Sequence, residues 1–322
     1  WRGEKDHSSL GLFPASELYD PAIAYYSGIG QPGRVLQVLH DAAADAAKSN
    51  AFSFWRRYKL GTVREARLIG NGPVAVAAID AIADRYYIPR EPEPGLSQEG
   101  RAWTAYLLSQ RYAATNVRSI DADTVERDAR FVLDTVRSDE QFRLPYLCCG
   151  VPALEVLRPL IAPLARAGIA PLHEKVIEEI EKARQTTLAL QSAQDFVSPS
   201  GTSIFTGFGT GSGYGAMLLK KNVDSSEESK SPYQKSWPLF RTAMAQWEGA
   251  LYRESRTEMK KYLRRARSRM QELQDIYAVK GDRFAAADGL VRARKELQLA
   301  EARESEIAGS YRQAIAGYRQ VV

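Results

Sequence analysis

Apolar residues recur in steps of three and four along the C-terminal third of the chain. This spacing is typical of a helix face that packs against a neighbour. The first run predicts one helix over Trp237 to about Tyr277, Lys280-Gly281-Asp282 then interrupts the pattern, and a second run follows. We therefore expect a long, coiled-coil-like antiparallel helical hairpin over residues 237–322. The first seam comprises Phe240, Met244, Trp247, Leu251, Met259, Tyr262, Ala266, Met270, Leu273 and Tyr277, and the second Leu290, Ala293, Leu297, Ala300, Ile307, Tyr311, Ala314, Tyr318 and Val321.

The length of this hairpin has a consequence for its surroundings. A helix of roughly 40 residues would span about 60 Å at its rise per residue, which exceeds the diameter of a small domain. We expect part of the hairpin to project from the body of the protein or to lie along a partner.

The first 195 residues have the same helical period and no convincing alternation of apolar and polar positions. The fold class predicted from the whole chain is all-α, with residues 15–195 forming a helical domain of α-hairpins, an irregular α-solenoid being one arrangement of them. Asp20-Pro21 has the residue types that begin a helix. The other predicted helices run from about Gly33 to Asn50, from Pro73, and over Ser97–Asn116, Asp121–Ser138, Pro152–Ala167 and Pro171 to about Gln194.

Two segments carry too little apolar surface to form a core. Residues 1–14 predict an extended N-terminal arm, and residues 196–236, rich in Gly, Ser and Lys, predict a linker or an arm that lies on a neighbour. The alternating glycines of residues 206–215, followed by Lys220 and Lys221, leave phosphate binding as an alternative. Their spacing does not match the phosphate-binding motifs of nucleotide-binding proteins.

The amino-acid composition restricts the possible functions of the protein only slightly. With 44% hydrophobic and 26% charged residues, the 322-residue chain is an ordinary globular protein. A net charge of +5 fits contact with nucleic acid, anionic lipid head groups or acidic protein. No apolar run is long enough for a transmembrane helix. The adjacent Cys148 and Cys149 predict two buried thiols in a reducing compartment, with a vicinal redox disulfide as the alternative.

Candidate catalytic chemistry is sparse in the sequence. His7, His40 and His173 have no His or Cys at ligand spacing, and no nucleophile motif surrounds a serine. The carboxylates are scattered along polar helix faces. We expect no catalytic residues, no metal site and no cofactor.

Two basic clusters are the candidate interaction surfaces. One surrounds the apolar seam of the first long helix, and it would lie along an RNA backbone or an anionic membrane, or pair with Glu296, Glu301, Glu304 and Glu306 of the next helix. The second interleaves arginines with Phe54, Trp55 and Tyr58, which would stack on bases or belong to the core. The first cluster is Lys260, Lys261, Arg264, Arg265, Arg267 and Arg269, and the second is Arg56, Arg57, Lys59, Arg64 and Arg67.

One short stretch resembles a known repeat family. Residues 309–318, Gly-Ser-Tyr-Arg-Gln-Ala-Ile-Ala-Gly-Tyr, are similar to the second helix of a tetratricopeptide repeat, with small and aromatic residues at the expected offsets. The preceding helix lacks the Trp, Leu-Gly and Tyr positions of that family, and no repeat of its length recurs along the chain.

These observations predict a non-catalytic accessory subunit of a large multiprotein assembly. We expect a mitochondrial energy-conversion complex, of the ATP synthase or respiratory-chain type, in which the arms and the hairpin assist assembly or stabilisation. The chain begins at Trp1, which fits a removed presequence, and a cytoplasmic location is the alternative. The alternative functions are an RNA-binding accessory subunit of an organellar ribosome and a helical enzyme with a non-local active site.

Overall fold

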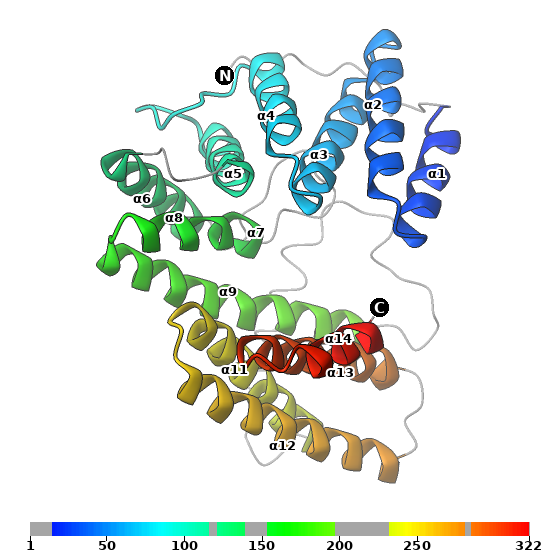
Figure 1. The fold of residues 1–322 in the computed structure, drawn as a ribbon, viewed down its shortest axis with the longest axis vertical. Coiled ribbons are helices and arrows are strands. Elements are labelled where there is room, and N and C mark those ends of the chain that lie inside the picture. Colours follow the sequence, from blue (N-terminus) through cyan, green and yellow to red (C-terminus); the bar gives the residue numbers. More distant parts are fainter. Residues whose placement is uncertain (1–14, 116–120, 139–152, 197–231, 281–284, 322) are drawn as a thin grey trace. The chain divides into compact units, whose positions relative to one another are not determined.

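The described part of the chain is entirely helical. A computed structural model describes residues 15–115, 121–138, 153–196, 232–280 and 285–321, and no strand occurs among them (Figure 1). The all-α class and the helical-hairpin arrangement are therefore confirmed. The predicted arm at 1–14 lies outside the described residues, as does most of the arm at 196–236. Phe196 ends one described helix, and residues 232–236 belong to the next.

The chain divides into two compact units, residues 1–176 and 177–322. The division falls inside one helix, α9 (Ala170–Phe196), whereas the sequence analysis assigned all residues to 195 to the first domain. The helices of the first unit are α1 (Ser16–Gly28), α2 (Pro32–Lys48), α3 (Phe52–Leu68), α4 (Gly72–Tyr86), α5 (Gln98–Ala114), α6 (Ala122–Ser138), α7 (Ala153–Leu157), the 3-10 helix η2 (Arg158–Leu160) and α8 (Ile161–Arg166).

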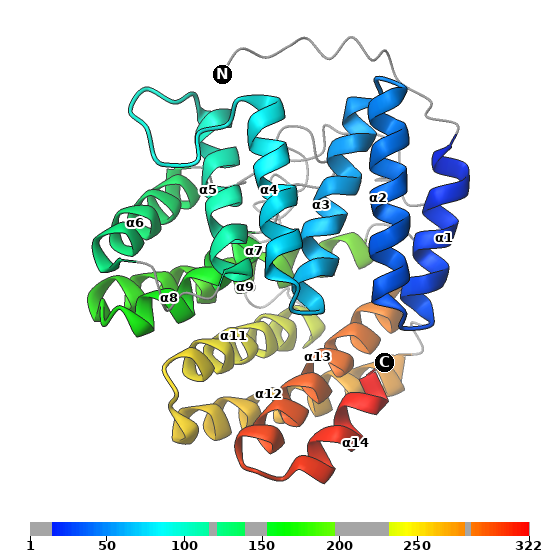
Figure 2. The same cartoon turned by 45° about the horizontal axis from the view of Figure 1, so that its top comes forward.

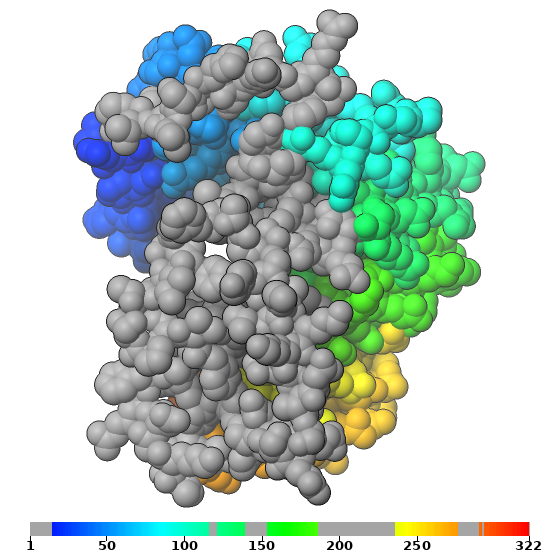
Figure 3. Space-filling model, turned by 180° about the vertical axis from the view of Figure 1, so that it is seen from behind, coloured from blue at the N-terminus to red at the C-terminus, as the bar shows by residue number. Residues whose placement is uncertain are grey.

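Helices α1 to α5 form a row in which each helix packs against the next (Figures 1 and 2). Short turns force neighbouring helices to run antiparallel. The side chains of Asn71 and Ser97 accept hydrogen bonds from the first-turn amides of α4 and α5, at 3.4 and 3.1 Å. Seen from the opposite side, the segments 88–115, 121–138 and 153–170 lie against one another (Figure 3).

Two helices of this unit have bounds in the structure that differ from the predicted ones. Helix α1 begins at Ser16, so Pro21 lies inside it and does not begin it. The helical turn before Pro21 is stabilised because Tyr19 packs on α2 and donates a hydrogen bond to Asp45. The helix predicted over residues 152–167 is divided into α7, η2 and α8, because Pro159 and Pro163 lack the amide proton that a continuous helix uses.

The second unit contains the C-terminal part of α9 and four further helices around one apolar core. Helices α11 and α12 form one antiparallel hairpin, α13 and α14 form another, and α12 also packs on α13. The core takes side chains from the two predicted seams, including Phe240, Met244, Met270 and Leu297. The four helices are α11 (Pro232–Tyr252), α12 (Arg256–Lys280), α13 (Ala285–Ile307) and α14 (Tyr311–Val321).

The prediction that the hairpin consists of two long, continuous helices is wrong. The first is broken at Glu254, whose φ of 54° is left-handed, and the second at Gly309, whose φ is 79°. At each break a backbone amide bonds to the carbonyl five positions back, from Ser255 to Ala250 and from Ser310 to Ser305, as in a Schellman motif. The longest resulting helix, α12, has 25 residues and spans only about 38 Å, so the inference that the hairpin projects loses its basis.

Candidate functional site

A cationic face covers the solvent side of α12. The opposite side buries Met259, Leu263, Ala266, Met270 and Leu273 against the core of the second unit. This division follows from the seam, because residues three and four apart share one face of a helix. The six predicted basic residues therefore lie beside or opposite the seam, and all are exposed except the partly buried Arg269.

Two of these six cations are paired with carboxylates. Arg267 contacts Glu301 of α13, as the pairing alternative expected. Arg269 donates to both carboxylate oxygens of Glu272 at 2.7 Å, one turn along α12. The other predicted partners that form ion pairs contact different cations: Glu296 pairs with Arg184, and Glu306 with Arg303.

The remaining four cations form a surface that we call the α12 basic face: Lys260, Lys261, Arg264 and Arg265. Within the described part of the chain, none of the four forms an ion pair with a carboxylate. Lys261 Nζ lies 5.5 Å from the ring centroid of Tyr262, and Arg265 Cζ lies 5.7 Å from it. These cation–π contacts hold two of the charged groups along one edge of the face.

The second predicted cluster lies on α3 and is largely used within the fold. Arg56 is only 4% exposed, and its guanidinium lies 5.0 Å from the ring of Tyr86 and 5.6 Å from that of Trp103. Arg67 donates to Gln110 of α5, and burial lowers the pKa of its guanidinium. The aromatic members are also part of the packing, since Tyr58 is buried and Phe54 and Trp55 pack against the same core.

The other cations of this cluster lie nearer to solvent. Arg57 forms an ion pair with Asp20 of α1 at 3.0 Å, and Arg64 lies 3.9 Å from its neighbour Glu65. Lys59 Nζ lies 6.0 Å from the ring centroid of Trp55. The cluster thus does not present one continuous cationic surface with exposed rings, which base stacking requires.

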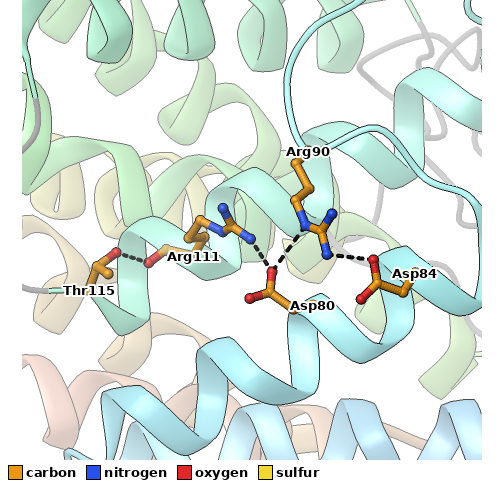
Figure 4. Close-up of polar contacts among 5 residues, drawn as sticks. All are labelled: Asp80, Asp84, Arg90, Arg111 and Thr115. Carbon is orange, nitrogen blue, oxygen red and sulfur yellow. Dashed lines mark hydrogen bonds and ion pairs between the residues drawn. The ribbon is translucent and has the colours of Figure 1, made fainter.

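An ion-pair cluster that the sequence analysis missed joins α4 to α5 (Figure 4). Asp80 accepts from Arg111 of α5 and lies 3.5 Å from Arg90, which also binds Asp84. The hydrogen bond to Asp84 is the main reason that the pKa of Arg90 is raised. Two cations and two carboxylates cancel, so the cluster holds the segment after α4 in place and offers no net charge to a ligand. In the sequence, the only local indication of this cluster is the pair Asp80 and Asp84, which lie one helical turn apart.

A small cavity lies beside this cluster. It has a volume of about 10 Å³, room for about one water molecule, and its wall includes Ile79, Leu107 and the two arginines, Arg90 and Arg111. A cavity of this size does not accommodate an organic substrate.

The terminal helices of both units expose apolar stripes that the sequence analysis also missed. Leu18 and Tyr25 on α1 and Ile29, which directly follows α1, are 77%, 63% and 48% exposed. On α14, Tyr311 and Ile315 are exposed one turn apart. Each of these helices packs on its neighbour through its other face, so these stripes face solvent.

The other candidate residues from the sequence are the histidines, the two cysteines and the glycine run. His40 is exposed on α2, and His173 is partly buried near the start of α9. His7, Cys148, Cys149 and the glycine run of residues 206–215 lie outside the described residues. Over the described ranges, no three His, Cys, Asp or Glu side chains gather as metal ligands, and no helix is long and apolar enough to cross a membrane. Comparison of the chain with protein-family models, with curated proteins and with solved structures finds no match.

Proposed function

We propose that the protein is a non-catalytic helical subunit that joins a larger assembly by binding a partner helix along the outer face of α1. The observation that supports this is the exposed stripe of Leu18, Tyr25 and Ile29, whose spacings of seven and four residues place them on one helical face. Large apolar side chains in a row on a solvent face are unusual in a monomer and mark an interaction surface.

The row of helices indicates what kind of partner would cover this stripe. The inner face of α1 uses Tyr19, Ile23 and Tyr26 against α2, at spacings of four and three residues. Helical rows that end in solvent usually carry a polar outer face on the last helix. Since α1 carries an apolar one, a further amphipathic helix would continue the row with the same packing that joins α1 to α2.

Charge adds a second property to this partner. The only charged residues of α1 are Glu17 and Asp20, and Asp20 is already paired with Arg57. We therefore expect the partner helix to have an apolar stripe flanked by basic residues, because opposite charges around an apolar contact favour association.

The experiment compares two triple variants expressed in the source organism. Replacement of Leu18, Tyr25 and Ile29 by Ser should shift the protein from a large native mass to the mass of a free chain. The control replaces Leu68, Ile69 and Val74 by Ser; these residues are also exposed on the first unit, and this variant should stay in the assembly. Cross-linking of the wild type should join α1 to a helix with the expected pattern.

Three outcomes would contradict the proposal. They are a wild-type protein that is a lone monomer in its source, a stripe variant that stays in the assembly, and cross-links from α1 to a second copy of this chain. The mitochondrial or cytoplasmic location stays a prediction, and fractionation of the source cells would test it.

A further inference from the structure

We propose that the α12 basic face binds the phosphate backbone of single-stranded nucleic acid without sequence preference. This inference goes beyond the proposed docking function, because it concerns another helix in the other compact unit. Its basis is the position of Lys260, Lys261, Arg264 and Arg265 on the solvent side of a helix whose opposite side is buried.

The charge density of this segment is high and is not neutralised locally. Residues 259–271 contain six Lys and Arg residues and no Asp or Glu. The pairs with Glu301 and Glu272 account for only two of the six, namely Arg267 and Arg269. Four like charges close together on a surface are costly unless an anion is present, so the face favours a polyanion.

The four cations form two short rows along the helix. Lys260 and Arg264 are four positions apart, as are Lys261 and Arg265, and each pair is therefore separated by about one turn, or 5.4 Å. Such rows place cations beside neighbouring phosphates of one strand. A flexible single strand can follow this convex surface, whereas a stiff duplex would touch only a few of the charges.

An anionic membrane fits the same charges less well. A helix that lies in a membrane interface buries an apolar face among the lipids. The apolar face of α12 is already buried in the protein core, through Met259, Leu263 and Met270 among others. Membrane binding would therefore rest on charge alone.

An acidic protein also fits less well, because a protein interface needs apolar anchors. Most of the binding energy of such interfaces comes from a few large side chains that become desolvated at the centre. Among the described residues, no large hydrophobic side chain between 240 and 290 is exposed. Backbone binding to nucleic acid needs only phosphate neutralisation. The one ring beside this face, that of Tyr262, packs partly against the core and contacts Lys261 and Arg265, so we expect no base readout.

The test measures binding of the full chain to a labelled, mixed-sequence RNA of about 20 nucleotides by fluorescence anisotropy over a range of salt. Four phosphate contacts predict a slope of about 3 in log Kd against log salt, or roughly a fifty-fold loss of affinity between about 50 and 200 mM. Substitution of Lys260, Lys261, Arg264 and Arg265 by Gln should weaken binding at least about tenfold at the lower salt and remove most of the slope. Glutamine keeps the helix propensity of the segment.

A matched control removes the same net charge elsewhere. It replaces four exposed cations on other helices by Gln and should bind like the wild type; these are Arg34, Lys175, Arg312 and Arg319. Equal weakening of both variants would overturn the proposal, because binding would then reflect net charge alone. DNA of the same sequence should bind within a few-fold of RNA, since the phosphates are shared.

Further arms distinguish the other polyanions. Stronger binding to anionic lipid vesicles or to polyglutamate than to RNA, dependent on the same four residues, would overturn the proposal. If the quadruple variant loses its helical circular dichroism, ultraviolet cross-linking of the wild type to RNA containing 4-thiouridine decides. Cross-links within residues 256–272 would support the proposal, and cross-links confined to other segments would overturn it.

Discussion

The guanidinium of Arg184 on α9 donates a hydrogen bond of 2.6 Å to Glu296 on α13, across 112 positions of sequence. The same guanidinium lies 3.4 Å from the carboxylate of Glu248 on α11, which is buried and also accepts from Tyr252. One cation thus contacts carboxylates on two other helices. Within the second unit, these contacts fix how the two hairpins pack on α9.

Removal of this cation should weaken the second unit. Arg184→Met keeps much of the side-chain volume but withdraws the charge from two partly or fully buried carboxylates. We expect the free energy of unfolding to fall by about 2 kcal/mol, measured by urea denaturation. The control Lys182→Met, on the same helix and 75% exposed, should change it by less than about 0.5 kcal/mol. Equal losses for the two variants would show that the Arg184 contacts are unimportant.

The backbones of α4 and α5 approach each other so closely at Gly72 that a larger residue is destabilising there. A Cβ at Gly72 would collide with the backbone carbonyl oxygen of Ala114, which ends α5 and cannot rotate away. Gly72→Ala should therefore destabilise the protein by about 1–3 kcal/mol in thermal or urea unfolding. Gly33→Ala, in the first turn of α2 with open space around it, should be neutral or stabilising. The reverse order of stability would contradict this geometry.

The two turns that divide the predicted long helices should respond in opposite directions to substitution. Glu254 adopts a left-handed conformation that is unfavourable for a residue with a side chain, so Glu254→Gly should raise the free energy of unfolding by about 1 kcal/mol. Gly309 has a φ of 79°, so Gly309→Ala should lower it by about the same amount. Differential scanning calorimetry measures both. Two changes of the same sign would argue that at least one of these breaks is not present in solution.

Buried tyrosines should make the first unit sensitive to alkaline pH. Burial raises the pKa of Tyr106 to about 12, and burial together with Asp20 raises that of Tyr58 to about 12. Below pH 10 both residues are protonated in the folded and unfolded states, so their contribution to stability is fully present. Between about pH 10 and 12 only the unfolded chain loses these protons, and stability falls as pH rises.

A variant isolates the contribution of one of these groups. Tyr106→Phe cannot ionise, so it should lack about 2 kcal/mol of the alkaline loss, followed by far-ultraviolet circular dichroism against pH in mild denaturant. Tyr25→Phe, on the exposed stripe of α1, serves as the control and should follow the wild-type curve. An identical curve for Tyr106→Phe would show that this phenol does not resist ionisation in the folded state.

Local pattern predicted much of the fold correctly. The apolar seam of the first long segment corresponds to the buried side of α11 and α12, from Phe240 to Leu273. The break at Glu254 was missed because this residue is not a glycine, although Ser255 and Glu258 have the spacing of a capping box. Both helices of a hairpin face the same core, so their apolar period continues across the turn. Periodicity alone therefore does not distinguish one long helix from a hairpin.

The candidate interaction surfaces were also predicted only in part. The sequence placed six cations around the seam of α12, but it did not determine that Arg267 and Arg269 are paired while the α12 basic face is not. Nor did it separate the exposed cations of α12 from Arg56, which is enclosed by Tyr86 and Trp103. Those outcomes depend on helices that are distant in sequence.

By itself, then, the sequence determined what is local in this protein: helical structure, the buried side of most helices and the concentration of positive charge on residues 260–269. These properties arise from spacings of three and four residues along one helix. Only the tertiary structure decided which charges meet, as with Arg184 and Glu296, and which apolar stripes stay open, as on α1. The physical reason is that burial and ion pairing depend on which helix faces pack together, and that choice is made by contacts far apart along the chain.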